Sequence, residues 1–181
     1  MIALGIPDTN RTCDLPLRVI TTATAGMMRK LFFLMALCWA CPASADFAGR
    51  VVAIHDGDSL TLRVDGKNIR VRLDGIDAPE PGQRFAKSAR SSLAKICAGK
   101  DAKVVERGKD ERGRIVGSVT CDGVDANGEQ VRRGMAWVYS TYLPFGSPLY
   151  EFESHARLRE TGLWRDRNPV PPWEWRKTAK K

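Results

Sequence analysis

The sequence has no apolar run of the roughly 18 to 20 residues that a membrane-spanning helix requires. It also has no internal repeat and no low-complexity segment, which argues against a repeat array or a disordered chain. Acidic residues are in the minority, with 21 Asp and Glu against 29 Lys and Arg, and the net charge is +8. We expect one globular domain, monomeric and not inserted in a membrane, whose charge favours polyanions such as nucleic acid.

The first 45 residues differ from the rest of the chain. Residues 28–45 read MRKLFFLMALCWACPASA, in which a basic pair, an apolar segment and the triplet Ala-Ser-Ala follow one another. This order is typical of a secretory signal, although a buried apolar helix is an alternative. We expect residues 27–45 to be a signal peptide cleaved after Ala45, with export to the periplasm or the medium. Residues 1–26 precede that signal, and we interpret them as an over-extended gene start.

Loss of residues 1–45 leaves two cysteines, Cys97 and Cys121. Two cysteines in an exported domain predict one disulfide, because the compartment is oxidising. Two separate buried thiols are the alternative.

The remaining sequence alternates in the manner of strands and then of helices. Strand patterns cover residues 49–54, 60–64, 69–73, 102–106 and 114–121, and helical spacing covers 85–96, 125–133 and 149–163. Five strands with a helix after the third predict an α+β fold, a five-stranded OB-type barrel with about three helices, over residues 46–165. The Pro- and Trp-rich basic tail, residues 166–181, is expected to cap the domain up to about Trp175 and then to fray, with stacking of its two tryptophans on bases as the alternative.

Acidic residues gather in two short segments. Asp56 and Asp58 lie in HDGDS, and Asp77 and Glu80 lie in LDGIDAPE. The hairpin between the segments folds them together, and such carboxylates repel one another unless a cation such as Ca²⁺ or Mg²⁺ neutralises them. Taken singly, each segment could be no more than a turn or a helix start, with Gly57 allowing the first to bend. HDGDS lacks the second glycine position and the distal glutamate of an EF-hand.

Two arginines complete the pattern. Arg72 lies on the open face of its strand, and Arg114 opens the last strand of the barrel. Guanidinium groups bind phosphate through two hydrogen bonds and stabilise the charge that develops on it, although surface ion pairs with the same carboxylates are the alternative. A cation that polarises phosphate, Glu80 as the group that activates water and two arginines together predict phosphodiester hydrolysis.

Four motifs in this order, VVAIHDGDSL, RVRLDGIDAPE, DERGRIVG and RRGMAWVY, resemble the staphylococcal nuclease family over about residues 49–164. The resemblance implies an OB barrel. It also implies Ca²⁺-dependent hydrolysis of DNA and RNA, single-stranded or locally opened, with little sequence preference and with 3′-phosphate products.

The resemblance assigns roles to matching positions. Arg72, Glu80 and Arg114 are the catalytic candidates; Asp58, Asp77 and the backbone carbonyl of Ala78 are the calcium ligands, with Asp56 as a nearby supporting acid. Tyr139 and Tyr142 are candidates for stacking on a base, and Lys109 for contacting a terminal phosphate.

Two other functions remain open from the sequence. The domain could be an OB-fold module that binds nucleic acid or protein without cutting. It could also be a metal-free ribonuclease that uses His55 and His155 as base and acid, although His155 lies in a predicted helix.

Overall fold

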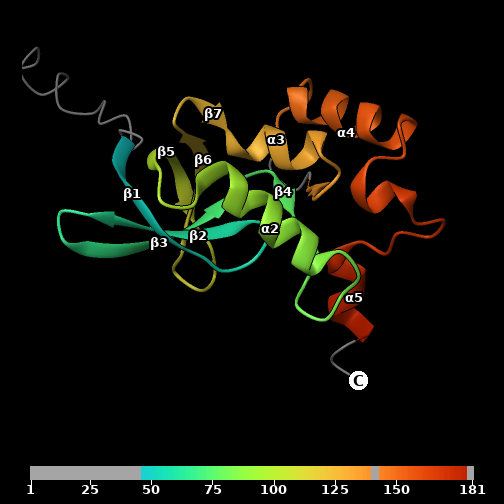
Figure 1. Cartoon of the computed structure of the whole chain (residues 1–181), viewed down its shortest axis with the longest axis horizontal. Helices are drawn as coiled ribbons and strands as arrows, with labels where there is room; N and C mark the ends of the chain where they lie inside the picture. The colour runs from blue at the N-terminus through green and yellow to red at the C-terminus, as the bar shows by residue number, and fades with distance from the viewer. Residues whose placement is uncertain (1–45, 140–142, 179–181) are drawn as a thin grey trace, which may run out of the picture. The chain divides into compact units, whose positions relative to one another are not determined.

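A computed structural model describes residues 46–139 and 143–178 of the chain (Figure 1). The predicted leader segments, residues 1–26 and 27–45, and the candidate Tyr142 lie outside the described residues. None of the described helices is long and apolar enough to cross a membrane.

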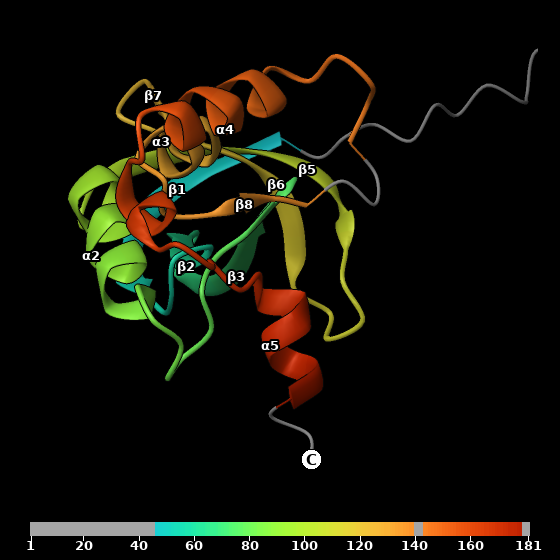
Figure 2. The ribbon, with the colours of Figure 1, turned by 90° about the vertical axis from the view of Figure 1, so that its right-hand side faces the viewer.

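Five strands form a closed barrel, as the sequence predicts. They are β1 (Asp46–Ile54), β2 (Ser59–Val64), β3 (Lys67–Leu73), β5 (Asp101–Lys109) and β6 (Ile115–Cys121). Neighbours in the order β3-β2-β1-β5-β6 are antiparallel, and a parallel pairing of β3 with β6 closes the ring. The fold is therefore an OB-like α+β fold (Figures 1 and 2).

The β2–β3 turn determines which residues face each other across this hairpin. Asp65 and Gly66 both have positive φ, 46° and 78°, which is the geometry of the tight hairpin turn expected from the Asp-Gly pair. The resulting register places Ser59 opposite Arg72. The end of β3 thus lies beside the start of β2.

Three two-residue strands accompany the barrel among the described residues. β7 (Val124–Asp125) pairs with the end of β6 and adds to the barrel sheet, and β4 (Ile76–Asp77) pairs with β8 (Trp137–Val138) in a separate two-stranded sheet. These strands are not predictable from the sequence, because two residues are too few to show a period. β4 matters for the site because it carries Asp77.

Four helices and one 3₁₀ turn complete the described part of the chain. They are α2 (Ala86–Cys97), α3 (Ala126–Arg132), α4 (Pro148–Leu158), η2 (Gly162–Arg165) and α5 (Pro172–Thr178). The Asp125 side chain caps α3 by accepting from the Gly128 N–H, and Pro148 begins α4 behind Ser147.

The structure corrects two predictions about the C-terminal part. The helix predicted over 149–163 ends at Leu158, because Glu160 and Gly162 have φ of 49° and 60° and reverse the chain. The tail was predicted to fray after about Trp175, whereas α5 continues to Thr178.

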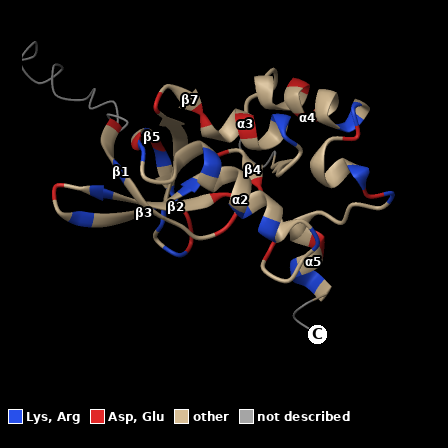
Figure 3. Cartoon of the chain, viewed as in Figure 1, with Lys and Arg blue, Asp and Glu red and all other residues tan. Residues whose placement is uncertain are grey.

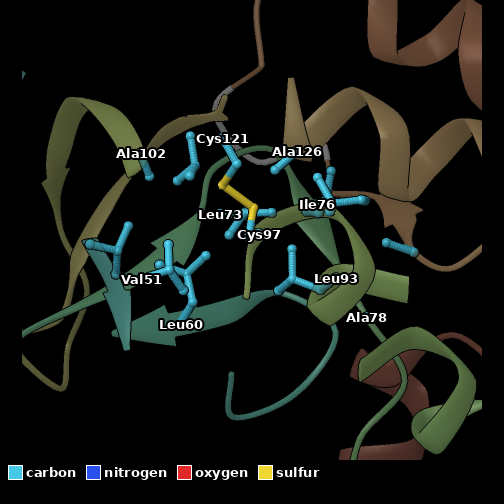
Figure 4. Packing of buried hydrophobic residues seen from close by; sticks show 14 of the residues in the cluster. Val51, Leu60, Leu73, Ile76, Ala78, Leu93, Cys97, Ala102, Cys121 and Ala126 are labelled. Carbon is cyan, nitrogen blue, oxygen red and sulfur yellow. A yellow bond between two sulfur atoms is a disulfide. The ribbon is translucent and has the colours of Figure 1, made fainter. Parts of the chain in front are cut away.

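The core fills the barrel and the space under α2 (Figure 4). Leu60 and Leu73 from the strands, and Leu93 from α2, have no exposed surface. Cys97 and Cys121 are joined by a disulfide with a Cα–Cα distance of 5.3 Å, which connects the end of α2 to the end of β6. The structure thus contains the predicted pairing.

Candidate active site

The two acidic segments lie together where the hairpin predicts. The N–H of Leu73 donates to the carbonyl of Asp58 at 2.8 Å, and the N–H of Ala78 donates to Oδ2 of Asp58 at the same distance. Asp58 therefore sits between the start of β2 and the chain that follows β3.

Asp58 is a buried carboxylate, 3% exposed. Its Oδ1 accepts from Nη1 of Arg72 at 2.9 Å, while Ala78 occupies Oδ2. Burial raises the pKa of Asp58 to about 8, because the favourable charge of Arg72 and the hydrogen bond from Ala78 only partly offset the loss of solvent. Both oxygens nonetheless accept as an ionised carboxylate does, so additional positive charge would stabilise this group.

Arg72 bridges the two acidic segments. Its Nη2 donates to Oδ1 of Asp77 at 2.7 Å, and Asp77 is 1% exposed. Burial opposes the charged guanidinium, but the carboxylates of Asp58 and Asp77 prevail and raise the pKa of Arg72. The two carboxylates lie within the span of a single guanidinium. Arg72 therefore forms ion pairs with these carboxylates in the structure, which is the alternative to phosphate binding that the sequence left open.

Asp56 supports the turn. Its Oδ1 accepts from the N–H of Asp58 at 3.0 Å, and its Oδ2 accepts from the hydroxyl of Ser59 at 2.8 Å. Both oxygens are thus engaged in holding the segment that carries Asp58. Gly57 is needed for close packing, since a Cβ there would lie 2.6 Å from the Cβ of Ala89.

Glu80 lies in the loop after β4, and its side chain is about one-third exposed, at 34%. The backbone N–H of Glu80 donates to the side chain of Gln83 at 3.0 Å, which fixes the loop. Its Oε1 accepts from Nη1 of Arg176, on α5, at 2.6 Å. Nη2 of Arg176 also donates to Oδ2 of Asp77 at 2.8 Å.

No sequence pattern predicts the role of Arg176. A contact between residues nearly 100 positions apart leaves no local signal in the sequence. The two carboxylates raise the pKa of the Arg176 guanidinium, with the hydrogen bond to Asp77 contributing most.

Arg114 lies apart from the carboxylates. Its Nε donates to Oδ2 of Asp110 at 2.7 Å, and no described ion pair joins it to Asp58, Asp77 or Glu80. It lines a hollow between β3 and the β5–β6 loop together with Arg70, Lys109 and Arg112. The structure thus brings the candidates Arg114 and Lys109 together in a basic hollow, and the parallel register of β3 with β6 sets that hollow beside Arg72.

The aromatic candidate Tyr139 directly follows β8 and is 40% exposed. Its ring lies 5.6 Å from the ring of Trp173, centroid to centroid, at an interplanar angle of 46°. The backbone N–H of Tyr139 donates to the carbonyl of Gly75 at 2.9 Å, which ties this position to the chain before β4.

The histidines of the metal-free alternative are not brought together by any described hydrogen bond or ion pair. Nε2 of His55 lies 2.8 Å from the Thr61 hydroxyl, and burial lowers the pKa of His55. His155 lies on α4.

The donor set fits a hard divalent cation. Asp58 and Asp77 offer carboxylate oxygens and Ala78 offers a backbone carbonyl, which are the donors that Ca²⁺ prefers. A bound cation would also stabilise the charged form of the Asp58 carboxylate, whose pKa is raised by burial. The described residues contain no group of three or more acidic, His or Cys side chains arranged to hold a metal, so water or substrate would supply the remaining ligands.

The fold and the site together define an OB-like barrel hydrolase with a carboxylate and arginine centre. The chain belongs to the staphylococcal nuclease family, since residues 70–166 match the family described as staphylococcal nuclease homologue. It is thus a staphylococcal-nuclease-like nuclease. The matched segment ends before α5.

Proteins with curated names show the same similarity. A micrococcal nuclease of Shigella flexneri is 39% identical over 163 residues, which cover 84% of this chain and 94% of that protein. An uncharacterized endonuclease of Escherichia coli is 39% identical over 151 residues, covering 82% and 98%. Staphylococcal-like nuclease CAN1 of Arabidopsis thaliana is 39% identical over 114 residues, covering 63% of this chain but 35% of that protein.

Proposed function

We propose that this protein is an exported, Ca²⁺-dependent nuclease that hydrolyses DNA and RNA with little sequence preference and leaves 3′-phosphate ends. One observation carries the proposal: the buried carboxylates of Asp58 and Asp77 share Arg72, and a second arginine joins Asp77 to Glu80. The excess of Lys and Arg over Asp and Glu, which persists without residues 1–45, supports a polyanionic substrate, which binds through its phosphates.

In this proposal Asp58, Asp77 and the carbonyl of Ala78 hold Ca²⁺. The bound cation would polarise the scissile phosphate and neutralise its charge. Glu80, on a loop fixed by Gln83, orients water and accepts its proton. Arg72 and Arg114 donate to phosphate oxygens, and stabilise the charge that develops there.

The basic hollow around Arg114 extends the substrate contact. Arg70, Arg112 and Lys109 offer charge to a backbone phosphate beyond the scissile one, without reading a base. Tyr139 offers an exposed ring on which a base could stack, which requires an unpaired base and therefore a single-stranded or locally opened substrate.

A cleavage assay tests the function. Purified protein is incubated with plasmid DNA or with RNA, in Ca²⁺ and in excess chelator. We expect both substrates to be cut only with Ca²⁺, and 3′-phosphate ends to form. Cleavage that survives the chelator would refute the calcium mechanism, and oligonucleotide binding with no cleavage in Ca²⁺ would favour the non-catalytic binding module.

The role of Glu80 is tested by Glu80→Gln, which removes the proton acceptor and keeps the shape. We expect kcat to fall by about 10²- to 10⁴-fold with little change in oligonucleotide affinity. Glu151→Gln, on the exposed surface of α4, is the matched control and should leave kcat unchanged. An unaltered kcat in Glu80→Gln would remove Glu80 from the mechanism.

A further inference from the structure

The C-terminal strap, residues 166–178, lies against the candidate active site. α5 follows the segment that approaches the loop after β4 (Figures 1 and 2), and Figure 3 shows basic residues on α5. Residues 167–178 follow those that match the nuclease family.

Two contacts fix the approach of the strap. The side chain of Gln83 donates to the carbonyl of Val170 at 2.6 Å, and Arg84 pairs with Asp166 at 2.7 Å. Both partners belong to the loop that carries Glu80. Prolines at 169, 171 and 172 restrict the unfolded strap, so that ordering it costs less entropy.

Arg176 occupies the carboxylates that the proposed cation needs. It donates to Oδ2 of Asp77 at 2.8 Å, to Oδ1 at 3.3 Å, and to Glu80 at 2.6 Å. Because Arg72 also donates to Oδ1, both oxygens of Asp77 are engaged, and this residue is 1% exposed. A cation cannot reach Asp77 from solvent while Arg176 is in place.

Arg176 also opposes the proposed action of Glu80. Its Nη1 holds Oε1 of Glu80 at 2.6 Å, so this oxygen is already engaged and is not free to contact a water molecule. The contact therefore occupies a metal ligand and the proposed water-orienting carboxylate at the same time, which is the opposite of what a third catalytic arginine would do.

Trp173 covers a second subsite. Its ring lies beside that of Tyr139, 5.6 Å between centroids and tilted by 46°, at the position proposed above for base stacking. The strap thus presents an aromatic ring and a cation, one helical turn apart on α5, to the two positions that base and metal would take.

We propose that the C-terminal strap is a built-in competitor of the nuclease site, displaced when Ca²⁺ and substrate bind. Arg176 occupies the cation position at Asp77 and Glu80, and Trp173 occupies the stacking position on Tyr139. The inference rests on the proposed calcium-dependent function. If only the molecules with a displaced strap can bind Ca²⁺ or substrate, the apparent affinity is reduced by the fraction of molecules in that state. Loss of the strap contacts should therefore tighten the binding of Ca²⁺ and of substrate.

Calorimetric titration of metal-free protein with Ca²⁺ tests the competition between Arg176 and Ca²⁺ without any turnover. We expect Arg176→Ala to lower the Kd for Ca²⁺ about tenfold or more, and Arg176→Lys to give an intermediate value. Lys177→Ala, the adjacent residue that pairs only with Glu174 in the described structure, is the control and should match the wild type. An Arg176→Ala protein that binds Ca²⁺ no tighter than the wild type would overturn the inference.

Thermal unfolding shows whether the variant is folded and supplies a second readout. Without Ca²⁺ the Arg176→Ala protein should melt below the wild type, because Asp77 and Glu80 lose their partner, and saturating Ca²⁺ should remove the difference. A melting difference that Ca²⁺ leaves unchanged would contradict the competition. If neither protein binds Ca²⁺, the proposed function fails, and this result differs from binding without a change in affinity.

The competition between Trp173 and a nucleotide base is tested by measuring the affinity for a labelled single-stranded oligonucleotide, by fluorescence anisotropy in the presence of chelator. Trp173→Ala should bind it more tightly, and Trp175→Ala should bind it as the wild type does. Weaker or equal binding by Trp173→Ala would show that Trp173 does not compete with a base.

Discussion

At the scale of single residues, the site is a balance of buried charges. Asp58 and Asp77 are almost without exposed surface, and Arg72 supplies a positive charge to both. Such a pair gives little net stability, but removal of one partner leaves the other charge buried and unpaired. Each side chain of the centre is therefore costly to change.

Arg72→Ala should destabilise the protein by about 3 to 5 kcal/mol, because two buried carboxylates lose their shared partner. Urea unfolding at pH 7 in chelator measures this cost. Arg70→Ala, two residues earlier on the same strand and exposed, is the control and should change stability by less than about 0.5 kcal/mol. Equal stabilities for the two variants would show that Arg72 does not hold the carboxylates.

Asp110 makes a pH-dependent contribution beside Arg114. Burial raises its pKa, but the hydrogen bonds from the backbone and side chain of Arg114 outweigh burial and lower it overall. A lowered pKa in the folded state stabilises the protein above the unfolded value near 3.8, and this stabilisation is lost as the pH falls through the folded value. Asp110→Asn should therefore cost about 1 kcal/mol at pH 7, and the cost should be smaller at about pH 2.5, below the unfolded value. Urea titrations at both pH values measure this, and an equal loss at both would contradict the charge-based explanation.

At the scale of elements, local patterns predicted the barrel strands, α2 and the meeting of the two acidic segments. These features depend on a period or on one short hairpin, both of which the sequence shows directly. β4, β8 and α5 were missed because their positions depend on pairing with distant residues. The contact of Arg176 with Asp77 joins residues 99 apart, and no local signal encodes it.

The turn that carries Asp58 packs on α2 through Gly57. A Cβ at this position would lie 2.6 Å from the Cβ of Ala89 and 2.7 Å from that of Ala78, closer than two carbons approach. Gly57→Ala should cost about 1 to 3 kcal/mol and weaken Ca²⁺ binding, because the turn must move away from α2. Unfolding and calorimetric titration measure both effects. Unchanged values would show that the turn has room to adapt.

At the scale of the whole molecule, one covalent link joins the helical layer to the barrel. Cys97 and Cys121 are fully buried at the ends of α2 and β6, 24 residues apart. Closing a loop of this length stabilises a fold by about 3 kcal/mol, mainly by restricting the unfolded chain. This link forms and persists in an oxidising compartment, which supports the proposal of export.

Export and the disulfide can be tested together by expressing the full chain in a bacterium and isolating the protein from the periplasm and the medium. We expect the exported protein to begin at Asp46 and to gain the mass of about two protons on reduction. Reduction should lower the free energy of unfolding by about 3 kcal/mol, and Cys97→Ala should do so without a reductant. A protein retained inside the cell with residues 27–45 attached would refute the signal, and equal stabilities before and after reduction would refute the structural role of the disulfide.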